Sequence, residues 1–292
     1  MKRCLTLALA LASVLPFTAA AHKQWLLPSS TVVAGNDVWI TVDAAVSNEL
    51  YYPDFVPVRL DNVTVTGPDG SAVQLQNAST GKTRSVFDVE LKQQGTYRIA
   101  NLNNGLSARW GERRTGGEGG KPDAGKGQAP AAPKPADNQD SGFLRNATVE
   151  DLTTKVPKNA KNLEISETLG RVETFVSNGE PTEIKPTGKG LELLPVTQPN
   201  DLFTGEPAKF KLLVDGKPAA GLEVQVVRGA TRYRNAQDEQ KVTTDTSGQF
   251  TVNWQEPGMY WLSASTSDNK TTVKQATQRR LSYVATLEVL PQ

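Results

Sequence analysis

Short runs of alternating apolar residues, separated by glycine- and proline-rich turns, occupy most of this 292-residue chain. In VWITV, the apolar residues Val38, Ile40 and Val42 alternate with residues of the opposite face, as in a strand with one buried side. In VTVTGPDGSAVQL, two such runs flank the turn GPDG, which is typical of a β-hairpin. Sustained helical periodicity does not compete with this pattern, so the sequence predicts an all-β protein.

Two blocks of the chain repeat the same order of strand, turn, strand, G-x-Y turn and strand. The first contains VTVTGPDGSAVQL and VFDVELKQQGTYRIA, and the second contains LEVQVV and TDTSGQFTVNWQEPGMYWLSA. Repeated short strands with regular turns are typical of β-sandwiches. The sequence therefore predicts two immunoglobulin-like sandwich domains, at residues 22–105 and 190–292, with return strands and a connector at residues 146–189.

Residues 106–145 have a different composition, rich in glycine, proline, alanine and lysine. Such a segment buries too little apolar surface to offset its ordering entropy, which predicts a disordered loop. Its stretch GKPDAGKG resembles a phosphate-binding loop, but Gly127 stands where a magnesium-binding serine or threonine is needed. We therefore expect no nucleotide binding.

The first 21 residues have the composition of a secretory signal peptide. Lys2 and Arg3 precede the apolar run LTLALALASVLPF, which is too short to span a membrane, and TAAA provides small residues for cleavage. Cys4 precedes the apolar run, so it is not placed for lipid attachment, and the exported chain has no thiol. We expect a periplasmic protein without a membrane anchor, cleaved after Ala21.

The composition also excludes several classes of function. With 32 basic and 31 acidic residues the chain is nearly neutral and has no basic run, so it lacks the charge pattern of a nucleic-acid-binding protein. Only one histidine is present, and it lies at the predicted new terminus, so a serine or cysteine nucleophile lacks its usual base. The sequence predicts a protein that is not an enzyme.

That one histidine, His22, directly follows the predicted cleavage site. Cleavage after Ala21 places small residues, Ala19 and Ala21, at the two positions that signal peptidase reads. An amino-terminal histidine offers its α-amine and its imidazole to Cu(II) or Ni(II), which favour nitrogen donors in planar geometry. A chain starting at Ala20 would instead begin Ala-Ala-His and could add backbone amides, and a histidine that only flanks the cleavage site would bind nothing.

Four segments together carry a resemblance to a known family. AHKQWLLPS, WITVDAAVSNELYY, KPTGKGLELLPVTQPNDL and RRLSYVATLEVLP resemble a bacterial periplasmic family of unknown function, often labelled as a nickel or cobalt transport periplasmic component. His22 and Trp25 match its opening Ala-His-x-x-Trp. The second half is also similar to carboxypeptidase-regulatory-like sandwiches, through GLEVQVV, TDTSGQF and GMYWLSAS.

The resemblance implies a role in uptake of nickel, cobalt or copper, with membrane components of metal uptake as partners. Members often carry histidines near the positions of Phe55 and Gln198, which this chain lacks. Asp54 and Asp201 lie beside these positions, so the expected metal site combines His22, Asp54 and Asp201. The alternative is a metal-independent interaction module that binds a peptide, a sugar or an envelope partner through exposed strands or aromatic side chains.

Overall fold

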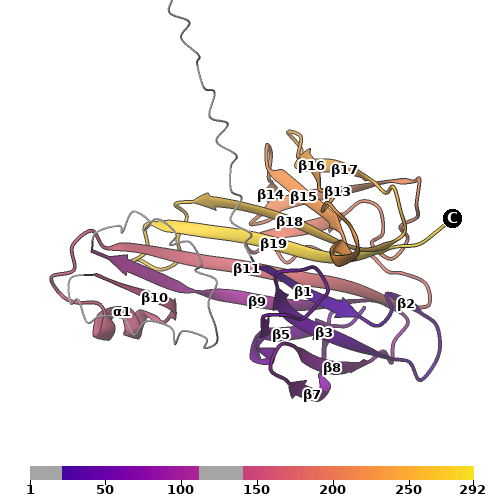
Figure 1. The fold of residues 1–292 in the computed structure, drawn as a ribbon, viewed down its shortest axis with the longest axis horizontal. Helices are drawn as coiled ribbons and strands as arrows, with labels where there is room; N and C mark the ends of the chain where they lie inside the picture. Colours follow the sequence, from indigo (N-terminus) through magenta and orange to yellow (C-terminus); the bar gives the residue numbers. More distant parts are fainter. Residues whose placement is uncertain (1–21, 112–140) are drawn as a thin grey trace, which may run out of the picture.

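The computed structural model describes residues 22–111 and 141–292, which form three β-sheets (Figure 1). The all-β prediction is confirmed, because the described residues add only one short α-helix, α1 (Val149–Lys155), and two 3-10 turns, η1 (Leu60–Asn62) and η2 (Thr231–Tyr233). None of the helices described has the length and apolar composition needed to cross a bilayer. The predicted signal peptide, residues 1–21, lies outside the described residues.

The large sheet has the strand order β16-β15-β18-β19-β11-β9-β5-β6, with β10 beside β9 and β2 beside β11. Its strands draw on both halves of the chain. They are β2 (Val32–Val33), β5 (Val63–Thr66), β6 (Ala72–Val73), β9 (Gly95–Trp110), β10 (Gly142–Ala147), β11 (Glu164–Asn178), β15 (Glu223–Arg228), β16 (Gln240–Thr243), β18 (Gly258–Asp268) and β19 (Gln278–Val289).

Two small sheets complete the fold. The N-terminal sheet has the order β1-β3-β8-β7 with β4 beside β3, and comprises β1 (Lys23–Pro28), β3 (Trp39–Ser47), β4 (Val56–Pro57), β7 (Gln76–Thr80) and β8 (Ser85–Glu90). The C-terminal sheet has β13 between β12 and both β14 and β17, and comprises β12 (Leu191–Pro195), β13 (Pro207–Val214), β14 (Lys217–Pro218) and β17 (Gln249–Asn253).

The two small sheets pack on opposite faces of the large sheet. On β11, Val172 and Val176 belong to the core under the N-terminal sheet, whereas Phe175 belongs to the core under the C-terminal sheet. Successive residues of a strand point to opposite faces, so even-numbered β11 residues face the N-terminal sheet and odd-numbered ones face the C-terminal sheet. We call these the N face and the C face of the large sheet.

Strand β11 lies at the centre of this arrangement. It pairs antiparallel with β9 along its whole length, Glu164–Asn178, and parallel with β19 over Ser166–Thr174. Residues 146–189, expected as return strands with a connector, thus contain the strand that joins the two sandwiches through main-chain hydrogen bonds.

The structure differs from the sequence prediction at three places. Strand β1 begins at Lys23, ahead of the first strand expected after Thr31. Strand β9 continues to Trp110 and β10 starts at Gly142, where they pair with each other, so both ends of the expected 106–145 loop are strands. The rest of that loop, residues 112–140, lies outside the described residues, together with the phosphate-loop-like stretch. Helix α1 was not expected, although Thr148 and Asp151 form a reciprocal capping box.

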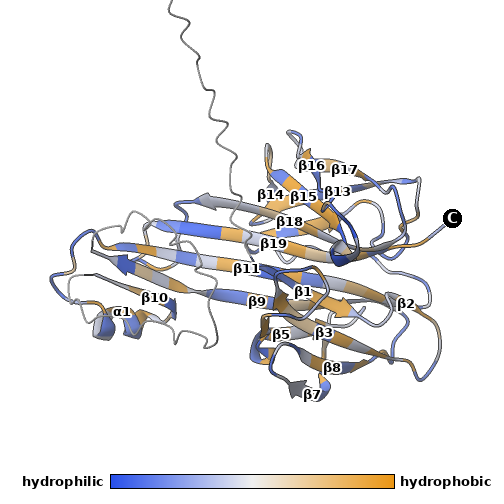
Figure 2. Ribbon diagram, in the orientation of Figure 1, coloured by the Kyte–Doolittle hydropathy of each residue, from blue (hydrophilic) through white to orange (hydrophobic). Residues whose placement is uncertain are grey.

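The long strands of the large sheet extend beyond both sandwiches (Figure 1). In this overhang the N face carries polar side chains, since Thr168, Arg280 and Ser267 lie side by side on it in the strand register. Figure 2 shows the same change along β19, which is mostly hydrophilic at its start and hydrophobic where the sandwiches cover it. The overhang therefore leaves part of the N face open to solvent.

Gly95, the first residue of β9, is required by both its backbone and its surroundings. Its φ is +123°, and an added Cβ would lie 2.7 Å from Pro68 Cβ and 2.9 Å from Thr182 Oγ1. We expect Gly95→Ala to lower the free energy of unfolding by about 1–3 kcal/mol through backbone strain and this clash. Urea unfolding measures the change, and Gly188→Ala is the control, since it also has positive φ but meets no atom within 4 Å.

Candidate functional site

The candidate site is the surface around the first residues of β1, where aromatic and basic side chains gather beside two loops, 48–55 and 229–239. We call this group of residues the N-terminal corner. The exposed imidazole of His22 stacks on the ring of Phe55, with 3.9 Å between ring centroids and an interplanar angle of 13°. Because the contact uses the face of the imidazole, the ring is held in place while its edge, which carries the two nitrogens, remains available.

Lys23 connects the corner to the second loop. Its ammonium nitrogen lies 5.9 Å from the centroid of the Trp261 ring and donates a 3.3 Å hydrogen bond to Gln237 Oε1. Burial lowers the pKa of Lys23 below its ordinary value, and the negative charge of Glu239 opposes that shift. The two loops thus hold adjacent residues of the chain, His22 and Lys23.

The floor of the corner is an aromatic cluster that joins the two halves of the chain. Trp25 is buried, donates a 2.8 Å hydrogen bond from Nε1 to Ser47 Oγ, and meets Tyr51 edge-on at 5.6 Å between centroids. Trp261 donates from Nε1 to the carbonyl oxygen of Gln24 at 3.1 Å. Trp25 and Trp261 belong to one buried cluster, so β1 is anchored directly to β18.

Tyr51 has an unusual backbone for a bulky residue. Its φ of +60° lies in the left-handed region, which is rare outside glycine, asparagine and aspartate. Its ring lies so close to Gly229 that a Cβ there would be 2.7 Å from Tyr51 Cδ2. Burial raises the pKa of the Tyr51 hydroxyl, and the side chain of Thr286 beside it opposes that shift. Backbone strain of this kind is concentrated at functional sites.

Aromatic side chains and one arginine form the rim of the corner. Tyr52 is 45% exposed and Tyr233 is 84% exposed, and Phe55 is also exposed beside His22. The guanidinium carbon of Arg232 lies 4.1 Å from the centroid of the Tyr52 ring, a cation-π geometry. Exposed tyrosine and arginine side chains are enriched where proteins bind partners.

Of the three expected metal ligands, His22 and Asp54 are connected through Phe55, which stacks on His22 and follows Asp54 in the chain, whereas Asp201 lies elsewhere. Asp54 precedes Phe55 in the loop that contacts His22, and its Oδ1 accepts a 2.8 Å hydrogen bond from the amide of Asn48. Asp201 follows Asn200, whose side-chain amide donates to the carbonyl oxygen of Thr31 beyond the far end of β1. The six residues of β1 span about 20 Å, so Asp201 is remote from His22.

Among the described residues, no group of three or more histidine, cysteine, aspartate or glutamate side chains is arranged to hold a metal ion. An ion at this corner would therefore need nitrogen donors from residue 22 itself in addition to side chains. Phe55 and Gln198, which replace the histidines expected from the resemblance, have other contacts: Phe55 stacks on His22, and Gln198 Nε2 donates to the carbonyl oxygen of Thr182 at 2.9 Å.

Sequence reasoning missed most of the corner beyond His22 and Asp54. Lys23 and Arg232 reach this corner through the packing of distant segments, for which a single sequence gives no signal. The run of adjacent aromatics Tyr51 and Tyr52 beside a proline was the one local sign that this loop differs from an ordinary turn.

Comparisons with known proteins give the chain a family. No curated protein matches it. Among solved structures, the D0-D1 domain of Intimin aligns with 90% of this chain and 97% of its own, at 11% identity and a TM-score of 0.21. The family described as "Domain of unknown function (DUF4198)" matches residues 19–268. Because that match covers well over half of its length, the chain belongs to the DUF4198 family.

Proposed function

We propose that the protein is an exported, non-enzymatic binding protein that holds one transition-metal ion at His22 and serves in metal uptake in the periplasm. Removal of the segment before His22 frees an α-amine next to its imidazole. The two nitrogens close a chelate ring on copper, nickel or cobalt, of which copper and nickel favour planar nitrogen sites.

The placement of His22 is the observation that carries the proposal. Its ring is exposed, yet stacking on Phe55 fixes it, so little conformational freedom is lost when an ion binds. Asp54 lies next to Phe55 on the same loop. Its Oδ1 accepts the hydrogen bond from the amide of Asn48, and its Oδ2 takes no part in that bond. Asp201 is left out of the proposed site because it lies beyond the other end of β1.

Native mass spectrometry of the untagged protein, purified without chelators and then titrated with Cu(II), Ni(II) and Co(II), tests the proposal. We expect one bound ion per chain when the chain starts at His22. His22→Ala should abolish this binding, and so should acetylation of the α-amine of His22, because acetylation removes one of the two nitrogen donors.

Carboxylate variants locate the remaining ligand. Asp54→Asn should weaken the affinity for the ion, whereas Asp201→Asn, which removes the same charge at the far end of β1, should leave it unchanged. Unchanged metal affinity in His22→Ala would refute the proposal, as would an empty protein that starts at His22 and stays empty after all three metals are added.

A second candidate function rests on the rim of the corner. Tyr52, Phe55 and Tyr233 are exposed, and Arg232 covers Tyr52, which is the composition of a surface that binds a peptide, a sugar or an envelope partner without a metal. Acetylation of the His22 α-amine separates the two candidates, since it should abolish binding of the metal ion and leave binding of a partner by the rim unchanged.

A further inference from the structure

The overhang of the large sheet ends in a strand edge that nothing in the described chain covers. Strand β15 pairs with β18 only over Tyr260–Ala264, while β18 continues to Asp268. Among the described residues, no backbone hydrogen bond reaches the outer side of Ser265–Asp268. We call Ser265–Asp268 the free edge; in Figure 1 it lies along the upper border of the overhang. Unpaired backbone groups on such an edge are ready to pair with another extended chain.

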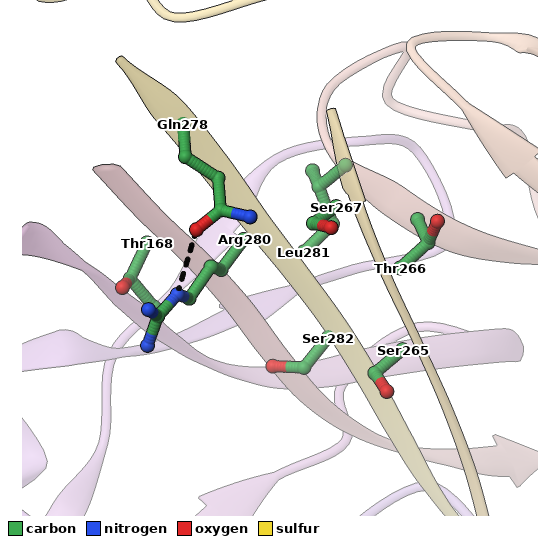
Figure 3. A pocket seen from close by; sticks show the side chains of 8 residues that line it. All are labelled: Thr168, Ser265, Thr266, Ser267, Gln278, Arg280, Leu281 and Ser282. Atoms are coloured by element: carbon green, nitrogen blue, oxygen red, sulfur yellow. Dashed lines mark hydrogen bonds between the residues drawn. The ribbon is translucent and has the colours of Figure 1, made fainter. Parts of the chain in front are cut away.

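A shallow trough of about 420 Å³ runs beside this edge across β11, β19 and β18 (Figure 3). Its lining is dominated by hydroxyl groups and contains no carboxylate. The lining residues are Thr168, Ser265, Thr266, Ser267, Gln278, Arg280, Leu281 and Ser282. We call this surface the hydroxyl trough.

Arg280 is the one charged residue in that lining. Its Nε donates a long, 3.4 Å hydrogen bond to Gln278 Oε1 (Figure 3), and no carboxylate of the described residues forms an ion pair with it. Its neighbour Arg279 points to the opposite face, where Asp215 and Asp268 neutralise it, each with 2.7 Å between charged atoms. The trough therefore presents one uncompensated positive charge.

The strand register links the free edge to this charge. Ser267 on β18 is directly opposite Arg280 on β19, and both side chains lie on the N face. A strand added outside β18 would lie about 4.8 Å from it, and its alternate side chains would share the N face with Ser265 and Ser267. A long arginine side chain on β19 can reach a carboxylate at that position.

We propose that the free edge binds an extended acidic peptide by β-strand addition, with Arg280 pairing with a carboxylate of the peptide. The backbone of the peptide supplies the hydrogen bonds that Ser265–Asp268 lack, and its alternate side chains contact the hydroxyl trough, as in other strand-addition complexes. A peptide is favoured over an acidic sugar because a sugar would leave the free edge unpaired, and because the trough lining contains no aromatic ring for sugar stacking. This site is separate from the N-terminal corner and does not depend on the proposed metal site.

Amide chemical shifts of the protein, recorded by NMR during titration with the peptide acetyl-Thr-Glu-Thr-Glu-Thr-Glu-amide, test this proposal. We expect the shifts to concentrate at Ser265–Asp268 and to saturate. Two further peptides are N-methylated, one at every glutamate and the other at every threonine. We expect one of them to lose binding and the other to keep it, because only every second backbone N–H of an added strand points toward the free edge. A peptide with lysine in place of glutamate should bind about tenfold more weakly, because it loses the charge pair and adds a like-charge repulsion of similar size.

Arg280→Gln should weaken the affinity about threefold, the effect of one exposed charge pair. The matched control Arg59→Gln, another exposed arginine in the N-terminal half, should leave the affinity unchanged. The proposal is overturned if both N-methylated peptides bind as well as the unmodified one, or if trigalacturonate shifts the same amides while the peptide does not. It is also overturned if sedimentation shows that a second copy of the chain already occupies the edge.

Discussion

Replacing Glu173 with alanine is expected to lower the free energy of unfolding by about 3–5 kcal/mol, the range for breaking a buried ion pair from one side. Glu173 is 1% exposed. Its Oε1 accepts a 2.9 Å hydrogen bond from Arg171 and lies 3.6 Å from Arg98 Nε, and its Oε2 accepts a 2.9 Å hydrogen bond from the Tyr283 hydroxyl. Without this carboxylate, two mostly buried guanidinium groups and one hydroxyl lose their shared partner.

Tyr283 makes the loss larger. Burial raises the pKa of its hydroxyl well above the ordinary value, and the charge of Glu173 raises it further, so the hydroxyl is a neutral donor at any ordinary pH. In Glu173→Ala this donor remains buried without an acceptor, which adds a desolvation cost.

Urea unfolding followed by circular dichroism measures the effect. Glu223→Ala is the matched control, because Glu223 pairs with Lys241 at a site where both side chains are about half exposed, and we expect it to cost less than about 1 kcal/mol. Equal losses in the two variants would show that the buried network does not stabilise the sheet.

Trp25→Ala is the second substitution with a large expected effect, about 3–5 kcal/mol, as for other fully buried tryptophans. Trp25 is 1% exposed and packs with Val227 and Trp261 from the other half of the chain. Its removal leaves a cavity between β1 and the large sheet and takes the hydrogen bond away from Ser47.

Trp39→Ala is the control, because Trp39 is 44% exposed, and we expect it to cost less than about 1 kcal/mol. Trp25→Phe should fall between the two, since it keeps much of the packing and loses the indole hydrogen bond. A Trp25→Ala protein as stable as the Trp39→Ala protein would contradict the assignment of Trp25 as the anchor of β1.

Local sequence patterns predicted the individual strands well. The alternation in VWITV corresponds to β3, where Ile40 and Val42 are buried, and the GPDG turn joins β5 to β6. These features depend on side chains two to eight residues apart, so they can be predicted from the sequence alone. The capping box at Thr148 and Asp151 is an equally local signal, and it marks the start of helix α1.

The pairing of distant strands could not be predicted in the same way. Nothing local to Glu164–Asn178 indicates that it pairs with β9 on one side and with β19, more than a hundred residues later, on the other. Likewise the sequence marked His22 by its uniqueness, but its stacking partner Phe55 and the neighbouring loop 229–239 follow only from how the sheets pack. The sequence favours Asp201 as a ligand because it lies near Gln198, but the neighbouring Asn200 contacts Thr31, beyond the end of β1 that is far from His22.

The central position of β11 limits how proteins with this fold can exchange domains during evolution. Ordinary two-domain chains exchange domains by joining gene segments at a linker. Here the segment between the halves is β11, whose residues contribute to both cores. Joining gene segments on either side of β11 would therefore leave one of the two halves with an incomplete set of strand hydrogen bonds and an exposed apolar face. The smallest unit that can be inherited or transplanted intact is the whole set of strands from β1 to β19.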